Sequence, residues 1–199
     1  NVSVSGFSIC NGNWSVFVEG FDSVIVCENV ISGCDRGVFL SGCNGGTISG
    51  NRFLGCRSSI ELWNSNGTMI RDNRISGMRY GVYLLFGSCD NVVEGNVMWD
   101  SPYEGVSLSW HCDGNTVVGN TVTLCGYGIV CGGTSDNVIC HNNFIDNVVQ
   151  VYSYSSSDVW DDGVKGNYWG DYEGLDDGSG SRVAGDGVGD TLLPWHGLD

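Results

Sequence analysis

The stretch NRISGMRYGVYL, residues 73–84, has two close counterparts earlier in the chain, NVISGCDRGVFL at 29–40 and NRFLGCRSSIEL at 51–62. Each copy starts with Asn, has an apolar residue two positions later, and ends in a pair of apolar residues that are also two positions apart. Apolar residues at this spacing predict short strands with one face turned inward. A unit this short cannot bury its own apolar face, so the repeat predicts coils that stack on one another.

The Asn of this repeat recurs along most of the chain, at intervals of 22, 22, 23, 24, 22 and 25 residues. We predict an all-β fold, a right-handed parallel β-helix (solenoid) of about seven coils, each adding a layer of about 4.8 Å. The coils are expected over residues 1–160, and residues 161–199 are expected to form the last rung and an acidic, aromatic C-terminal cap. Such a cap would cover the unpaired backbone edge of the final coil.

The repeated Asn is expected to form a structural ladder at one corner of the solenoid. Stacked amide side chains can hydrogen-bond to the amides above and below and to the turn backbone, which satisfies polar groups buried there. The members of the ladder are Asn29, Asn51, Asn73, Asn96, Asn120, Asn142 and Asn167.

Composition excludes several classes of partner. The net charge is −15, with 23 acidic and 8 basic residues, and this argues against nucleic acid, whose phosphates require a basic surface. The sequence contains no run of 18 apolar residues, so it predicts no membrane-spanning helix. The chain starts at Asn1 rather than Met, which is the pattern of a processed secreted chain or of an excised fragment.

The ten Cys residues follow the same grid. Cys34, Cys56 and Cys125 lie five positions after the ladder Asn and are expected in the core, as small hydrophobic residues. Cys27, Cys140, Cys10 and Cys43 are expected to face outward. Cys89 and Cys112 each precede Asp at the same turn of adjacent coils, so we expect either a disulfide or stacked thiols there.

The coils, followed by GNYWGDY (166–172) and GDGVGDT (185–191), resemble the NosD-like parallel β-helix family over nearly the whole chain. The resemblance implies an archaeal secreted or cell-surface protein of the carbohydrate-binding and sugar-hydrolase β-helix group. An extracellular location would make glycosylation possible at the three Asn-x-Ser/Thr triplets, which start at Asn1, Asn13 and Asn66.

The resemblance also implies metal sites. Family members often carry an Asp-rich string like a calcium loop, which Asp186 and Asp190 match, but Ala184 replaces one expected ligand. Calcium takes six to eight oxygens, so we expect either a Ca²⁺ site or a solvated acidic turn here, with the candidate ligands Asp171, Asp176, Asp177, Asp186 and Asp190. The family name implies copper, yet His111–Cys112 and Cys140–His141 do not share a rung position, so no copper site is predicted.

Exposed aromatic residues are expected to line the outer face beside the second strand of each coil. A row of exposed rings is typical of a binding surface, here formed by Phe17, Phe39, Trp63, Tyr83, Phe86, Trp110, Tyr152 and Tyr154. Such a row could stack on sugar rings. It could also pack against a second subunit, because the cores of protein interfaces are rich in aromatic residues. Loops folded over the rings would be the structural alternative.

Catalytic carboxylates are sparse. Polysaccharide hydrolases need two or three at fixed separations, and the grid offers only Asp100 and Glu104 at one turn, while Glu61 stands alone between Phe39 and Tyr83. The sequence therefore favours a non-catalytic secreted or surface protein, which binds glycan through its aromatic face or assembles with copies of itself. The alternative is a polysaccharide hydrolase or lyase with carboxylates on the outer face.

Overall fold

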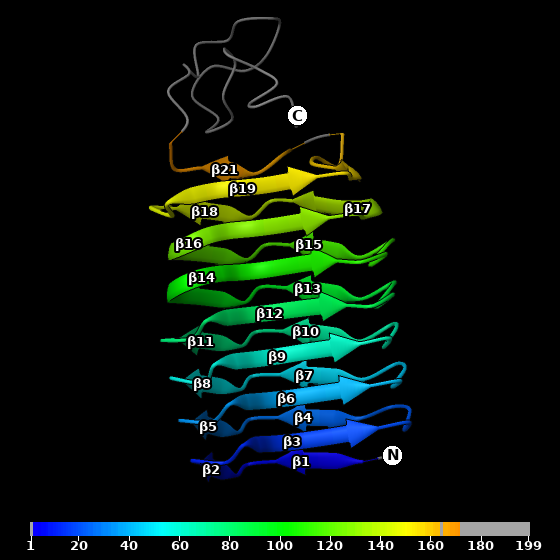
Figure 1. The fold of residues 1–199 in the computed structure, drawn as a ribbon, viewed down its shortest axis with the longest axis vertical. Helices are drawn as coiled ribbons and strands as arrows, with labels where there is room; N and C mark the ends of the chain where they lie inside the picture. Colours follow the sequence, from blue (N-terminus) through cyan, green and yellow to red (C-terminus); the bar gives the residue numbers. More distant parts are fainter. Residues whose placement is uncertain (1, 164, 172–199) are drawn as a thin grey trace, which may run out of the picture.

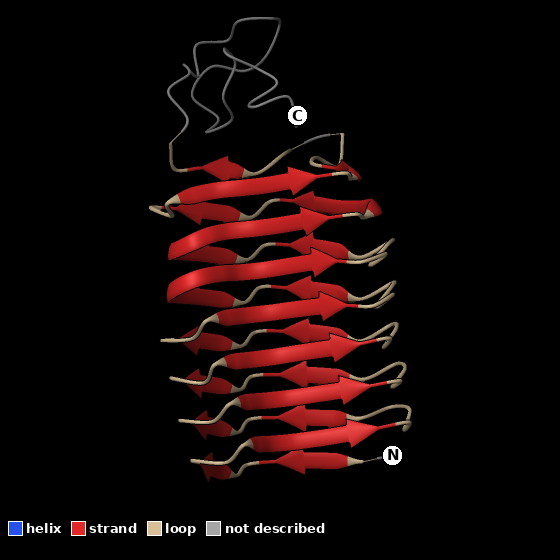
Figure 2. Cartoon of the chain, in the orientation of Figure 1, coloured by secondary structure: helices blue, strands red, loops and turns tan. Residues whose placement is uncertain are grey.

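The protein is a parallel β-helix, seen in a computed structural model that describes residues 2–163 and 165–171. Within these residues the regular structure is entirely strand (Figure 2). The coils stack along one axis in sequence order, as Figure 1 shows from β1 to β21. The predicted all-β solenoid is confirmed, and it has about eight turns.

Three strand positions recur in each coil and define three faces. The first face is an eight-stranded sheet made of β1 (Ser3–Ser5), β4 (Ile25–Cys27), β7 (Thr47–Ser49), β10 (Met69–Arg71), β13 (Val92–Glu94), β15 (Thr116–Val118), β17 (Ser135–Cys140) and β20 (Ser157–Val159). All its pairings are parallel. Short strands of two to six residues suit such a solenoid, because each needs only neighbours above and below.

The second and third faces join at a corner. The second face contains β2 (Ser8–Cys10), β5 (Val30–Ser32), β8 (Arg52–Leu54), β11 (Arg74–Ser76), β18 (Asn143–Ile145) and β21 (Tyr168–Trp169). The third contains β3 (Trp14–Glu19), β6 (Arg36–Ser41), β9 (Ser58–Trp63), β12 (Tyr80–Leu85) and β19 (Val149–Tyr154). Two longer strands, β14 (Val97–Ser109) and β16 (Thr121–Gly132), run through this corner and belong to both faces.

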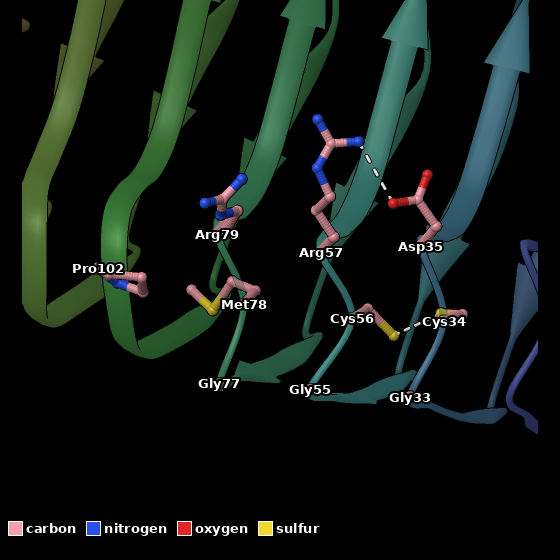
Figure 3. A pocket seen from close by; sticks show the side chains of 10 residues that line it. All are labelled: Gly33, Cys34, Asp35, Gly55, Cys56, Arg57, Gly77, Met78, Arg79 and Pro102. Atoms are coloured by element: carbon pink, nitrogen blue, oxygen red, sulfur yellow. Dashed lines mark hydrogen bonds and ion pairs between the residues drawn. The ribbon is translucent and has the colours of Figure 1, made fainter.

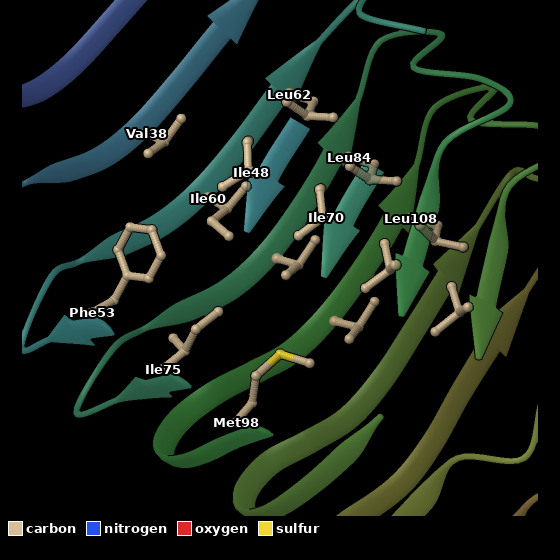
Figure 4. Close-up of a cluster of buried hydrophobic side chains, with 14 of the residues drawn as sticks. Val38, Ile48, Phe53, Ile60, Leu62, Ile70, Ile75, Leu84, Met98 and Leu108 are labelled. Atoms are coloured by element: carbon tan, nitrogen blue, oxygen red, sulfur yellow. The ribbon is translucent and has the colours of Figure 1, made fainter. Parts of the chain in front are cut away.

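The core fills the space between the faces with columns of aliphatic side chains (Figure 4). Ile48 and Ile70 on the first face meet Ile60, Leu62 and their equivalents on the third, and all four are fully buried. The two-residue spacing of the sequence repeat turns one apolar side chain after another inward. This continuous core makes the outer faces rigid platforms for exposed side chains.

The ladder Asn residues form one continuous column, which is buried from Asn29 to Asn142. In each of the six steps from Asn29 to Asn167, the Nδ2 of one Asn donates to the Oδ1 of the next over 2.9–3.0 Å. The same Oδ1 also accepts the backbone N–H of the preceding ladder Asn. These bonds satisfy buried polar groups at the corner between the first and second faces.

A second polar column, which the sequence reasoning missed, lies at the entry to the first face. Asn91, Asn115 and Asn137 are linked in the same way, and Asn137 donates to Asp158. Its signal is an Asn two positions before the inward Val93, Val117 and Ile139.

The cysteines depart from the predicted pattern at three points. Cys89 and Cys112 are both free thiols, so the disulfide alternative is excluded. Cys112 occupies the position that Ser88 has in the preceding coil, and its side chain points into the core. Its thiol donates to the carbonyl oxygen of Ser109, as the hydroxyl of Ser88 donates to that of Leu85. Cys89 instead accepts the backbone N–H of Asp113. Cys43 and Cys140 are buried rather than exposed.

Candidate functional site

Aromatic rings on the outer side of the third face form a continuous row. Ring centroids lie 4.8 Å apart for Trp14–Phe39, 5.1 Å for Phe39–Trp63, 4.9 Å for Trp63–Phe86 and 5.0 Å for Phe86–Trp110. Each of these contacts is edge-to-face, the arrangement that the ring quadrupole favours. The row therefore holds each ring in a fixed orientation along five coils.

All of the predicted aromatic residues except one are at least partly exposed to solvent. Trp110 is 60% exposed, Tyr152 50% and Phe17 49%. Phe39 is buried, because Trp14, Phe17 and Trp63 pack around it and the Arg36 guanidinium lies over its ring. Its predicted place on the binding surface is corrected to a supporting role beneath it.

Next to this row lies an open groove of about 290 Å³ on the third face. Its walls combine aromatic and charged side chains, namely Arg36, Arg57, Ser58, Glu61, Trp63, Tyr80, Tyr83, Leu85, Phe86 and Trp110. We refer to it as the aromatic groove. Of these residues, Trp63, Tyr83, Phe86 and Trp110 were predicted from the sequence, whereas the roles of Arg36, Glu61 and Tyr80 were not.

Glu61 is the fixed charged group of the aromatic groove. Its side chain is nearly buried, and Oε2 accepts a hydrogen bond of 3.0 Å from Nε of Arg36 within an ion pair. Oε1 accepts the indole N–H of Trp63 over 2.8 Å. Because both carboxylate oxygens are held, Glu61 orients Trp63 and Arg36 toward the groove.

A second carboxyl group, Glu104, lies on the same face beside Tyr80, its register partner. Burial raises the pKa of Glu104 above its usual range, with a hydrogen bond from Ser107 opposing the shift. Its Oε2 is buried without a hydrogen-bond partner. Burial, and after it the charge of Glu104, raise the pKa of Tyr83 to about 12. The charge of Glu61 contributes to the same rise. Glu61 and Glu104 thus flank one tyrosine.

The predicted carboxylate pair of Asp100 and Glu104 lies within one strand, β14, and its catalytic role stays a prediction. Asp100 is exposed within β14, with φ 61°, and Glu104 pairs with Tyr80 on the third face. Within the described part of the chain no hydrogen bond or ion pair links the two. Glu61 is the register partner of Tyr83, and Glu104 is the register partner of Tyr80, whose ring stacks on that of Tyr83.

A larger groove of about 470 Å³ follows the corner between the second and third faces (Figure 3). Glycine backbone forms much of its wall, and Arg57 pairs there with Asp35 over 3.3 Å. Cys34 and Cys56 are in contact at 2.6 Å, and their hydrogen bond lowers the pKa of Cys34 to about 7 and raises that of Cys56. This groove lacks exposed aromatic rings, so it offers fewer recognition groups than the aromatic groove.

The remaining candidate residues are scattered. Asn13 is exposed, and Asn66 accepts the backbone N–H of Cys89. Asp171 is exposed. Asn1, Asp176, Asp177, Asp186 and Asp190 lie outside the described residues, so calcium binding and glycosylation at these positions stay predictions. None of the described segments is a helix that could cross a membrane.

One group of three metal-ligating side chains gathers in the described part of the chain: Cys140, His141 and Asp162. Their ligand atoms all lie within 4.8 Å of one another. His111 and Cys112, the other neighbouring pair, do not join such a group, since Cys112 faces the core and His111 the solvent.

Two solved structures with a similar fold belong to an enzyme that is longer than the present chain and has a low sequence identity to it. The DFA-IIIase from Arthrobacter chlorophenolicus A6 without its lid, in complex with GF2, matches with a TM-score of 0.62 at 15% identity. This match covers 92% of the present chain and 56% of that one. The same enzyme in complex with GF2 matches with a TM-score of 0.54 at 13% identity over 84% and 48% of the two chains. The chain thus spans about half the length of these structures, and the likeness shows the fold alone.

A search of curated protein sequences gave no match. The family model described as periplasmic copper-binding protein (NosD) matches residues 1–174. Copper prefers thiolate and imidazole ligands, and Cys140 and His141 supply both donor types, so the residues present fit such a metal. With the β-helical coils and this match over most of its length, the chain belongs to the NosD family.

Proposed function

We propose that the protein is an extracytoplasmic β-helix whose primary role is to bind saccharides in the aromatic groove, without acting on them. The observation that carries this proposal is that one open groove combines exposed rings with a locked Glu61–Arg36 pair. The apolar C–H faces of sugars pack on aromatic rings, while charged groups fixed in place bond the hydroxyls. The family description as periplasmic supports a location outside the cytoplasm.

Binding can be tested with a panel of neutral and acidic oligosaccharides, followed by tryptophan fluorescence and calorimetry. Trp110→Ala removes the most exposed ring of the groove and should weaken binding by about tenfold or more, a loss of about 1.4 kcal/mol. Phe21→Ala is the matched control, because Phe21 is also 60% exposed but lies in the first coil, outside the groove. No binding by the wild type, or equal losses in both variants, would contradict the proposal.

Self-assembly is the rival use of the same rings, since an exposed aromatic row also suits a second copy of the chain. Sedimentation velocity at increasing protein concentration separates the two. A monomer that binds sugar supports the saccharide proposal, whereas a Trp110-dependent oligomer that ignores sugars supports assembly.

A second candidate function, hydrolysis of a glycosidic bond, is favoured by the two carboxyl groups around Tyr83. Glu104, whose pKa burial raises, would serve as the proton donor. Glu61, paired with Arg36, would serve as the second carboxyl group. Two carboxyl groups in contrasting environments are the usual equipment of a glycosidase. The test is an assay for new reducing ends on oligosaccharide substrates. If the wild type releases them, and Glu104→Gln binds the saccharide but releases none, the protein is a glycosidase.

A further inference from the structure

The cluster of Cys140, His141 and Asp162 lies apart from the aromatic groove, at the corner where the first face meets the second. Consecutive residues of a strand point to opposite sides, and β17 ends at Cys140. His141 has φ 58°, which breaks this alternation and brings its ring to the side of the Cys140 thiol. The residue before the ladder Asn has a positive φ in the earlier coils too, at Gly50, Gly95 and Gly119 but also at Glu28 and Asp72. His141 therefore holds a backbone conformation that costs about 1 kcal/mol or more for a residue with a side chain.

Asp162 reaches this corner from the following coil. The interval between the ladder residues Asn142 and Asn167 is 25 residues, longer than the other intervals, and Asp162 lies within it, outside the regular strands. Asp162 Oδ1 accepts the backbone N–H of Lys165 over 2.8 Å, and Oδ2 lies 3.0 Å from Nε2 of His141. The backbone N–H of His141 donates to the carbonyl of Gly166. The loop and the histidine are thus tied together at two points.

The three donors differ in chemistry: a thiol sulfur, an imidazole nitrogen and a carboxylate oxygen. Zinc-type ions bind these three donor types, and sites with three protein ligands leave one position open. Calcium requires oxygen ligands, so the cluster is unsuited to it. Cys140 is buried while His141 and Asp162 are exposed, so an ion could reach the site from solvent and be held at its base by sulfur.

We propose that Cys140, His141 and Asp162 form a mononuclear site for a divalent transition-metal ion of the zinc type, with one coordination position open. The argument rests on these three side chains and is independent of saccharide binding. Binding releases the thiol proton, because the thiolate is the ligand form of cysteine. The ion would also link the loop around Asp162 to the preceding coil.

Cobalt(II) is the probe, because a thiolate bound to Co²⁺ gives a near-ultraviolet charge-transfer band. Reduced, metal-free protein should bind one equivalent of Co²⁺ with this band, and Zn²⁺ should displace it. Cys140→Ser should abolish the band, and His141→Asn and Asp162→Asn should each weaken Zn²⁺ binding about tenfold or more, the range seen when metal-site groups are removed. Saturating Zn²⁺ should raise the Tm of the wild type but not that of Cys140→Ser.

Cys27→Ser is the matched control, because Cys27 occupies the same strand column as Cys140 in an earlier coil. It should keep the band and the zinc affinity. The proposal is overturned if the band is absent, if it survives Cys140→Ser, or if Cys27→Ser removes it. A parallel titration with Cu⁺ is informative too: tight binding that needs Cys140 and His141 but not Asp162, with no binding of Zn²⁺, would replace the divalent site by a two-ligand copper site.

Discussion

At the residue scale, the buried Asn column is a chain of amide hydrogen bonds in which every member serves its neighbours on both sides. Asn73 Oδ1 accepts both the backbone and the side-chain N–H of Asn51, while Asn73 Nδ2 donates to Asn96 and to the carbonyl of Ile48. A substitution at one rung therefore leaves unpaired groups in two coils, and an unpaired buried polar group costs more than a hydrogen bond contributes.

Asn73→Ala should lower the free energy of unfolding by about 2–5 kcal/mol, since four hydrogen bonds are lost at a buried position. Urea denaturation measures the loss. Asn44→Ala is the control, because Asn44 also bonds an adjacent coil, through Asp22, but at the surface. Its cost should stay within about 0.5 kcal/mol, as for other surface substitutions. Equal costs at the two positions would show that the column is not a special source of stability.

Glu104 makes stability depend on pH. Burial raises the pKa of its carboxyl in the folded chain, so the folded state holds this proton more tightly than the unfolded state. The resulting stabilisation is complete below the ordinary carboxylic pKa of the unfolded chain and is lost as pH rises through the raised pKa. Glu104→Gln, which has no proton to lose, should match the wild-type Tm at acidic pH and exceed it at neutral pH. Calorimetry across this range tests the point, and a constant Tm difference would refute it.

At the element scale, the strands of the third face start with an inward residue that has little or no side chain. A Cβ at Gly81 would lie 2.9 Å from Sδ of Met98 and would overlap the carbonyl oxygen of Gly105. Gly37 and Gly128 meet Phe53 and Phe144 in the same way. Large side chains on the second face thus fill the space that small residues leave on the third, and this packing closes the corner.

Gly81→Ala should therefore destabilise the fold by about 1–3 kcal/mol through overpacking. Ser59→Ala, in the neighbouring strand at the same register, is the control, because a Cβ is already accommodated there. Urea denaturation should show little change for Ser59→Ala. A neutral Gly81→Ala would mean that Met98 moves aside without cost.

At the scale of the whole molecule, each coil contacts only the coils above and below it, so the solenoid is a sum of similar layers. Deleting residues 51–72 removes one full repeat and joins Gly50 to Asn73, which recreates the Gly–Asn junction before the ladder. The Asn column would then run from Asn29 directly to Asn73. The same deletion removes Glu61 and Trp63 from the aromatic groove.

This deletion variant should fold into a shorter β-helix and lose saccharide binding. Circular dichroism should keep its β-sheet form, and the urea m-value should fall by about a tenth, in proportion to the surface exposed on unfolding. Deleting residues 51–61, half a repeat, should prevent cooperative folding because it puts outward side chains into the core. A cooperative fold for the half-repeat deletion would contradict the layered model.

The sequence by itself determined the solenoid, the Asn column and the inward columns, because each follows from a repeat of 22 to 25 residues that stacks equivalent positions. Only the tertiary structure decided what the outer positions do. Phe39 is covered by neighbours from the coils on either side, Cys112 is shifted by one register position, and Glu61 meets Arg36 from another coil. Asp162 reaches His141 through a loop that breaks the repeat. Exposure and charge pairing depend on which side chains lie above and below a residue, and a pattern of spacing does not specify how those side chains turn.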